Sequence, residues 1–137
     1  MSDSAAAAHP NLALLKRLGD HFPHDLTGAG ELIADDFVFH YFNTNLPELA
    51  GDYIGVDGLQ GFFQKLGAKS KGTFRAKNKN LVHVGDELVV TSATPEMTLE
   101  GKSFEWDALF IWRVVGGRFV EAWDIPAVNT IRRFEPG

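Results

Sequence analysis

Two hydrophobic periods alternate along the first half of the chain. Apolar side chains recur every three or four positions in residues 10–22 and 56–66, which predicts two amphipathic helices. A further helix is predicted over residues 27–35, although Gly28 and Gly30 lower its helical propensity. Residues 37–42 are aromatic and β-branched without a break, and residues 52–54 are a short extended piece, so both are predicted strands.

After residue 72 the pattern is typical of strands. Glycine-containing pairs at positions 85–86, 101–102 and 116–117 divide this region into four long segments, as hairpin turns do. Helices followed by consecutive strands indicate an α+β fold, with three N-terminal helices packed on one face of a curved, mostly antiparallel sheet. We expect residues 1–137 to form a single domain, with residues 1–9 as a disordered tail.

Alternation within residues 104–115 separates two faces of a strand. The second face mixes charged and apolar side chains, so part of its apolar surface needs a cover, and we expect a homodimer through the outer sheet face. The first face is wholly apolar and is predicted to point inward: Phe104, Trp106, Ala108, Phe110, Trp112 and Val114.

Composition narrows the class of protein. The chain has 137 residues, which is enough for a core, and it has no cysteine, which excludes disulfides and thiolate sites. Its net charge of −5 argues against a nucleic-acid partner. There is no apolar run near the ~20 residues of a membrane span. Since the first residues lack a basic segment, we expect a cytoplasmic protein without a membrane partner.

The order of these motifs resembles the nuclear-transport-factor-2-like superfamily, in particular its SnoaL-like branch of polyketide cyclase-like and ketosteroid isomerase-like proteins. The similarity spans about residues 10 to 134, and its most specific stretches are residues 37–42, 50–59, 72–74, 111–114 and 117–124. The resemblance implies a cone-shaped fold with a small-molecule pocket. Family members run different reactions in the same cone, so the function must be argued from residues.

Carrying over the family's catalytic positions leaves one acid. The base of ketosteroid isomerases falls on Tyr41, their oxyanion carboxyl on Phe110 and their tyrosine near Arg17, so that reaction is not expected. The acid–arginine–acid set of limonene epoxide hydrolase falls on Ala93, Pro95 and Asp124. Asp124 also matches the acid on the last strand of SnoaL-type polyketide cyclases, where the resemblance implies a general base.

Asp124 and Tyr41 are the catalytic candidates. Asp124 shares a predicted cavity-facing side with Val120 and Ala122, where desolvation raises a carboxyl pKa. The alternative is a carboxylate that caps the following turn or pairs with Arg132 or Arg133. Tyr41 can donate a hydrogen bond to a ligand carbonyl, or it can be a core tyrosine with a satisfied hydroxyl.

Asn43 and a set of wall residues are predicted to bind the ligand, although each is also compatible with an ordinary structural role. Asn43 can position a ligand oxygen or shape the following loop. His40 should face the opposite side of its strand, which favours packing or interface use over catalysis. Asp107 is assigned to the outer face or the dimer seam, and the alternative is an ion pair with Arg113. The predicted pocket walls are Phe39, Thr91, Ala93, Met97, Trp106 and Phe110.

These observations favour a cofactor-free protein with an apolar pocket. The five histidines lie on separate elements without ligand spacing, so no metal site is expected. The leading hypothesis is a pocket for a small apolar or aromatic, oxygenated ligand. Asp124 would carry acid/base catalysis of the isomerase, cyclase or hydrolase type, and Tyr41 and Asn43 would orient the substrate oxygen. The alternative is a non-catalytic binding protein or dimeric scaffold.

Overall fold

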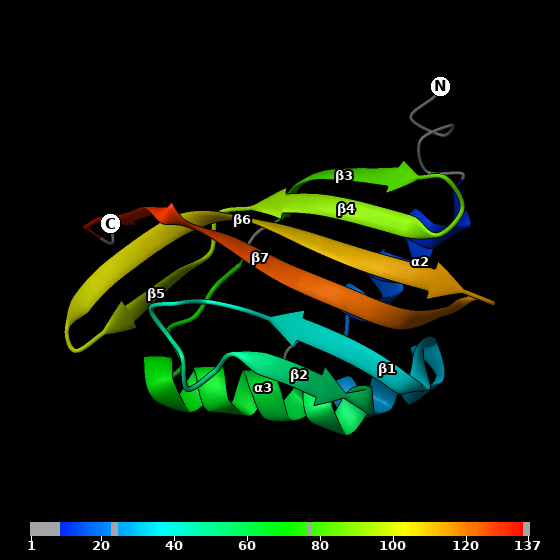
Figure 1. The fold of residues 1–137 in the computed structure, drawn as a ribbon, viewed down its shortest axis with the longest axis horizontal. Coiled ribbons are helices and arrows are strands. Elements are labelled where there is room, and N and C mark those ends of the chain that lie inside the picture. The colour runs from blue at the N-terminus through cyan, green and yellow to red at the C-terminus, as the bar shows by residue number, and fades with distance from the viewer. Residues whose placement is uncertain (1–8, 23–24, 77, 136–137) are drawn as a thin grey trace.

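A computed structural model of the chain describes residues 9–22, 25–76 and 78–135. Two α-helices, one 3-10 helix and seven strands make up this part of the chain (Figure 1). The helical elements are α2 (Pro10–Gly19), η1 (Leu26–Leu32) and α3 (Gly55–Ser70). The strands are β1 (Ile33–Tyr41), β2 (Gly51–Ile54), β3 (Asn78–Val84), β4 (Leu88–Ala93), β5 (Glu96–Leu99), β6 (Lys102–Val115) and β7 (Arg118–Arg133).

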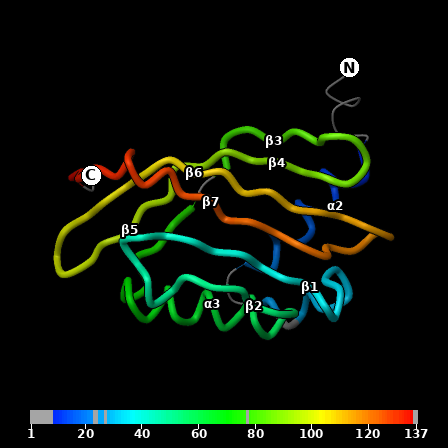
Figure 2. The backbone as a smooth tube through the Cα atoms, viewed as in Figure 1, coloured from blue at the N-terminus to red at the C-terminus, as the bar shows by residue number. Residues whose placement is uncertain are grey.

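One curved sheet organises the molecule. Its strand order is β2-β1-β7-β6-β4-β3, with β5 paired to β6 outside this path. The pairing of β1 with β7 is parallel and every other pairing of these named strands is antiparallel, as the sequence predicted for most of the sheet. In the backbone view, β7 runs between β1 and β6, while α3 lies along β1 and β2 (Figure 2). The long strand β7 therefore joins the two halves of the sheet.

The prediction of three N-terminal helices was wrong, because residues 27–35 do not form an α-helix. They divide between the 3-10 helix η1 and the first residues of β1. Glycine has low helical propensity, and Gly28 and Gly30 both lie in η1. A Cβ on Gly28 would come within 2.6 Å of Asp25 Oδ2, so the Asp25 side chain would have to move for a larger residue. The strand consequently begins at Ile33, four residues before the predicted start.

Helix α2 is correct in type but ends early. The His9 ring accepts a hydrogen bond from the Asn11 N–H, and Pro10 occupies the first turn, where its missing N–H costs nothing. The helix ends at Gly19, not at residue 22. His9 is thus an N-cap, whereas residues 1–8 of the predicted tail lie outside the described residues.

The four predicted strand segments after residue 72 become five strands. The segment between the glycine pairs at 85–86 and 101–102 is divided at Thr94 and Pro95 into β4 and β5. Both of these strands pair with β6. Pro95 has no N–H to donate to the ladder, although its carbonyl accepts from the Trp106 N–H. None of the helices in the described ranges is long and apolar enough to cross a membrane.

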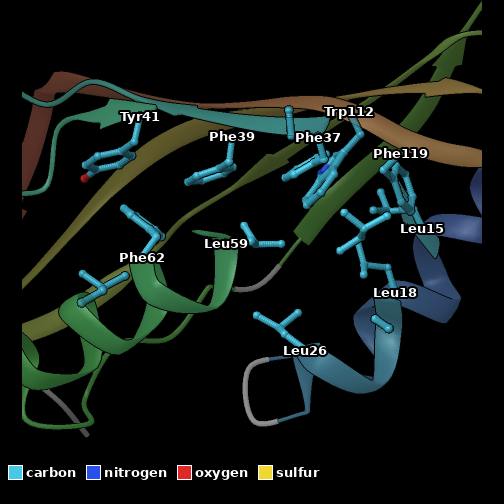
Figure 3. Close-up of a cluster of buried hydrophobic side chains, with 14 of the residues drawn as sticks. Leu15, Leu18, Leu26, Phe37, Phe39, Tyr41, Leu59, Phe62, Trp112 and Phe119 are labelled. Atoms are coloured by element: carbon cyan, nitrogen blue, oxygen red, sulfur yellow. The ribbon is translucent and has the colours of Figure 1, made fainter. Parts of the chain in front are cut away.

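The core fills the space between the helices and the inner face of the sheet. In Figure 3 Phe39 and Tyr41 from β1 point toward Phe62 of α3, whereas Phe37 lies beside Trp112. The rings of Phe39 and Tyr41 each lie 4.9 Å from that of Phe62. Burying one such ring stabilises the fold by about 1.5–3 kcal/mol. Aromatic side chains therefore occupy the space between β1 and α3.

Candidate functional site

A row of predicted site residues crosses the inner face of the sheet. Tyr41 of β1 is the register partner of Asp124 of β7, and Asp124 is the partner of Phe110 of β6. Phe110 in turn is paired with Thr91 of β4. Since register partners point to the same face, these four side chains lie side by side. The sequence-based alternation thus placed Asp124 and Tyr41 on the correct face.

Asp124 is a half-buried acid with a strongly perturbed pKa. Desolvation by burial raises the pKa of its carboxyl to about 8. Within the described ranges no hydrogen-bond donor offsets this desolvation, and Arg132 binds Glu105 and Asp107 instead of Asp124. The alternative of an Asp124–Arg132 pair was therefore wrong. At neutral pH the carboxyl is largely protonated and can donate a hydrogen bond.

Tyr41 is buried with only 6% of its surface exposed, and Asn43 sets the direction of its hydroxyl. The backbone N–H of Asn45 donates to Asn43 Oδ1 at 2.8 Å, which turns Nδ2 toward Tyr41. Nδ2 then donates to Tyr41 Oη at 3.0 Å. The phenol oxygen is an acceptor in this contact, so its own proton is left to donate elsewhere. Burial raises the pKa of Tyr41 to about 12, which keeps that proton in place.

A pocket of about 370 Å³ lies where β1 ends beside β7. Strand β1 stops at Tyr41 while β7 continues to Arg133, so the neighbouring part of β7 loses its partner on this side. The pocket is open to solvent, and its lining includes residues whose side chains belong to both faces of the sheet. It is lined by His40, Tyr41, Phe42, Gly51, Asp52, Trp123, Asp124, Ile125 and Pro126.

Two of the predicted site residues, Tyr41 and Asp124, border this pocket. Asn43 lies one contact behind it, bound to Tyr41. Phe110 is half-buried beside Asp124. The other predicted wall residues are buried in the core, and their contact with a ligand stays a prediction: Phe39, Thr91, Ala93, Met97 and Trp106.

The outer wall of the pocket includes residues that the sequence did not assign to a site. Asp52 and Trp123 flank His40, which faces outward as predicted. Pairing the two predicted strands around residues 40 and 52 as a hairpin would have revealed the Asp52 contact. The alternative of an ion pair between Asp107 and Arg113 was wrong, because Arg113 binds Glu87 and Glu121. In the described part of the chain, no group of three or more His, Asp or Glu side chains is arranged to hold a metal ion.

The arrangement of sheet and helices is shared with proteins of the NTF2-like fold. A curved sheet covered on its inner face by helices also occurs in an NTF2-like protein of unknown function from Burkholderia pseudomallei. That structure has 22% identity and a TM-score of 0.75, and the match covers 88% of this chain and 92% of that chain. The family model of the SnoaL-like domain matches residues 21–122, and the chain belongs to this family.

Other solved structures show the same fold. IdmH from Streptomyces antibioticus, a candidate polyketide cyclase, has 28% identity and a TM-score of 0.66, with 88% of this chain and 94% of that chain covered. TerC, co-crystallised with polyporic acid, has 21% identity and a TM-score of 0.74, with 88% and 93% covered. A comparison with curated protein sequences gave no significant match.

Proposed function

We propose that the chain binds a small, largely apolar ligand with a carbonyl oxygen, and that Asp124 transfers a proton to and from it. The observation that carries this proposal is Asp124, a residue of the pocket lining whose carboxyl pKa is raised to about 8 by burial. An acid/base group is most effective when its pKa lies near the working pH, because both of its forms are then populated. The similarity to IdmH supports the cyclase class for this chemistry.

The chemistry needs an acid/base group and a hydrogen-bond donor. The ionised fraction of Asp124 takes a proton from the carbon beside the ligand carbonyl. The C–H electrons form a C=C bond, and the carbonyl π electrons move to the oxygen. Because Tyr41 Oη accepts from Asn43, the Tyr41 hydroxyl proton is available to donate to this oxygen, and it stabilises the negative charge there. The resulting enolate can attack a second carbonyl in an aldol-type ring closure, and protonated Asp124 returns its proton to the oxygen formed.

Binding without turnover is a second candidate function. It is favoured by the packed interior, in which Phe62 contacts both Phe39 and Tyr41, and by the openness of the pocket. A reaction that must exclude water gains from an enclosed site. Under this alternative, Asp124 and Tyr41 act as neutral hydrogen-bond donors to a ligand oxygen and no proton leaves the ligand.

An exchange experiment separates the two candidates. The probe is β-tetralone, an apolar aromatic ketone with an acidic C–H, and proton NMR in D₂O follows deuterium uptake beside its carbonyl. We expect the wild-type protein to accelerate uptake, Asp124→Asn to lose at least about 100-fold of that acceleration and Tyr41→Phe about 10-fold. Asp107→Asn, an exposed acid on the outer face, is the matched control.

Two results would count against catalysis. Equal exchange by the wild type and Asp124→Asn would reject Asp124 as the base. Binding of β-tetralone, seen as chemical-shift changes at Tyr41 and Asp124 without any exchange, would favour the second candidate. Polyporic acid, the molecule co-crystallised with TerC, is a second probe for the binding measurement alone.

A further inference from the structure

His40 lies between two carboxylates on the face of the sheet opposite the Tyr41–Asp124 pair. Its Nδ1 is 2.8 Å from Asp52 Oδ1, and its Nε2 is 2.8 Å from Glu121 Oε2. His40 belongs to β1, Asp52 to β2 and Glu121 to β7. The contacts thus connect three neighbouring strands through one ring.

This geometry fits an imidazolium and not a neutral imidazole. A neutral ring has one N–H and one lone pair, so one of its nitrogens would point a lone pair at a carboxylate oxygen 2.8 Å away. The doubly protonated ring donates to both carboxylates. Burial of the ring opposes protonation, but the hydrogen bonds and charges of Asp52 and Glu121 outweigh it and raise the pKa of His40 above 6.5.

The other charged groups around the ring support the same charge state. Glu121 also accepts from Arg113 Nε at 3.4 Å, and Arg113 Nη1 binds Glu87 at 2.7 Å. The indole of Trp123 stacks on His40 with ring centres 5.4 Å apart, and the Arg113 guanidinium lies 5.7 Å from the indole centre. Three carboxylates therefore share two cations, and loss of the His40 proton would leave Asp52 and Glu121 without one of them.

The cluster adjoins the candidate site along both strands. His40 and Trp123 are register partners, and the next pair along the same ladder is Tyr41 and Asp124. His40 and Asp52 also line the pocket that Tyr41 and Asp124 border. Strand β2 has four residues and lies at the edge of the sheet, where it pairs with β1 on one side only and packs against α3.

We propose that His40 is a positioning residue, whose imidazolium holds β2 and β7 against β1 and thereby fixes Tyr41 and Asp124 at the pocket. Both ring nitrogens are engaged by Asp52 and Glu121, so neither nitrogen is left to bind the ligand. The effect on proton transfer rests on the proposed function, whereas the bridge itself does not. Raising the pH through the pKa of His40 breaks one of the two contacts and loosens the end of β1.

NMR titration tests the bridge without any ligand. At neutral pH we expect nitrogen shifts of His40 that show N–H protons on both ring atoms, and a titration midpoint above 6.5. The Asp52→Asn variant should lower this midpoint. Asp86→Asn, which changes the exposed partner of His9, should leave it unmoved. A neutral His40 ring at pH 7 in the wild type would overturn the inference, whatever the exchange experiment gives.

The positioning role is tested at the neighbouring residues. We expect the ring carbon shifts of Tyr41 and the carboxyl shift of Asp124 to show an inflection at the His40 midpoint, which moves with it in Asp52→Asn. The β-tetralone exchange rate should fall about 10-fold in Asp52→Asn at pH 8, with apparent affinity changed less than about 2-fold, and Asp52→Glu should restore it.

The outcomes separate the two proposals. If the Tyr41 and Asp124 shifts ignore the His40 titration, the positioning role is wrong while the proposed function stands. If those shifts follow His40 but the wild type exchanges no deuterium, the proposed catalysis is wrong while the positioning role stands.

Discussion

Tyr41 and Asp124 are the last register partners of the parallel ladder between β1 and β7. The pair before them, His40 and Trp123, points to the opposite face because side chains alternate along a strand. One step along the ladder therefore separates a phenol and an acid that face the helices from an imidazole and an indole that face outward.

The buried acid should lower stability as the pH rises. The folded chain holds the Asp124 proton up to about pH 8, whereas the unfolded chain releases it near pH 3.8. Unfolding thus releases a proton between these values, and wild-type stability falls across that window. The Asp124→Asn variant keeps a neutral side chain throughout. We expect equal stability near pH 4 and a variant more stable by up to about 4 kcal/mol at pH 7, from ~1.4 kcal/mol per pKa unit.

Urea unfolding at several pH values between 4 and 9 measures this difference. The gap between the two proteins should widen with pH and become constant above about pH 8. Parallel stability curves would show that the Asp124 carboxyl is solvated in the folded chain.

The Asn43–Tyr41 hydrogen bond should be visible as coupling between two substitutions. Tyr41→Phe leaves the Asn43 amide without its acceptor, and Asn43→Ala also removes the acceptor of the Asn45 N–H. We expect each to cost about 1–3 kcal/mol and the double variant to cost about 1 kcal/mol less than the sum. Urea unfolding of the four proteins gives the coupling. Strict additivity would mean that this hydrogen bond contributes nothing to stability.

Alternation predicted the faces of the strands well, because it depends on neighbouring residues alone. It placed Trp106 and Trp112 in the core and Asp107 outside, and it separated Tyr41 from His40. The family resemblance pointed to Asp124 as the acid of the last strand. Alternation was thus sufficient to predict which way the side chains of most strands point, and the family resemblance was sufficient to single out one candidate acid.

Contacts between segments that are far apart along the chain could not be predicted from the sequence. The His40 bridge requires the register of β1 with both β2 and β7, and Glu121 lies 81 positions from His40 in the chain. The filling of the interior depends on how the Phe62 ring of α3 packs against the Tyr41 ring. The pattern of apolar residues along the chain does not specify this contact. The sequence pattern predicted an α-helix where the structure has the 3-10 helix η1. The two glycines of this segment lower its helical propensity only moderately, so tertiary contacts decide which conformation it adopts.

We propose that the outer sheet face pairs with a second copy of the chain. Leu109 and Ile125 are register partners on this face, 44% and 46% exposed, and Phe42 beside the pocket is 70% exposed. Covering these side chains removes apolar surface from water. We expect a dimer in sedimentation equilibrium, which Leu109→Lys should convert to the 15.1 kDa monomer. Glu100→Lys, in the turn after β5, is the control, and a monomeric wild type at micromolar concentration would contradict the proposal.

Two glycines of α3 provide a matched test of how closely this helix packs on β2. A Cβ on Gly58 would lie 2.8 Å from the backbone carbonyl carbon of Tyr53, whereas a Cβ on Gly61 would meet no atom within 4 Å. Alanine favours a helix over glycine by about 1 kcal/mol, so Gly61→Ala should stabilise the chain by up to that amount. Gly58→Ala should instead destabilise it by about 1–3 kcal/mol, because backbone atoms must move apart.

The same contact affects the pocket, since β2 contributes Gly51 and Asp52 to its wall. If α3 and β2 hold each other in place, Gly58→Ala should also shift the NMR signals of Asp52 and His40, and Gly61→Ala should not. Equal stabilities of the two alanine variants in urea would instead show that α3 can move away from β2 without cost. In that case the position of β2 at the pocket would depend on its pairing with β1 and on the His40 bridge.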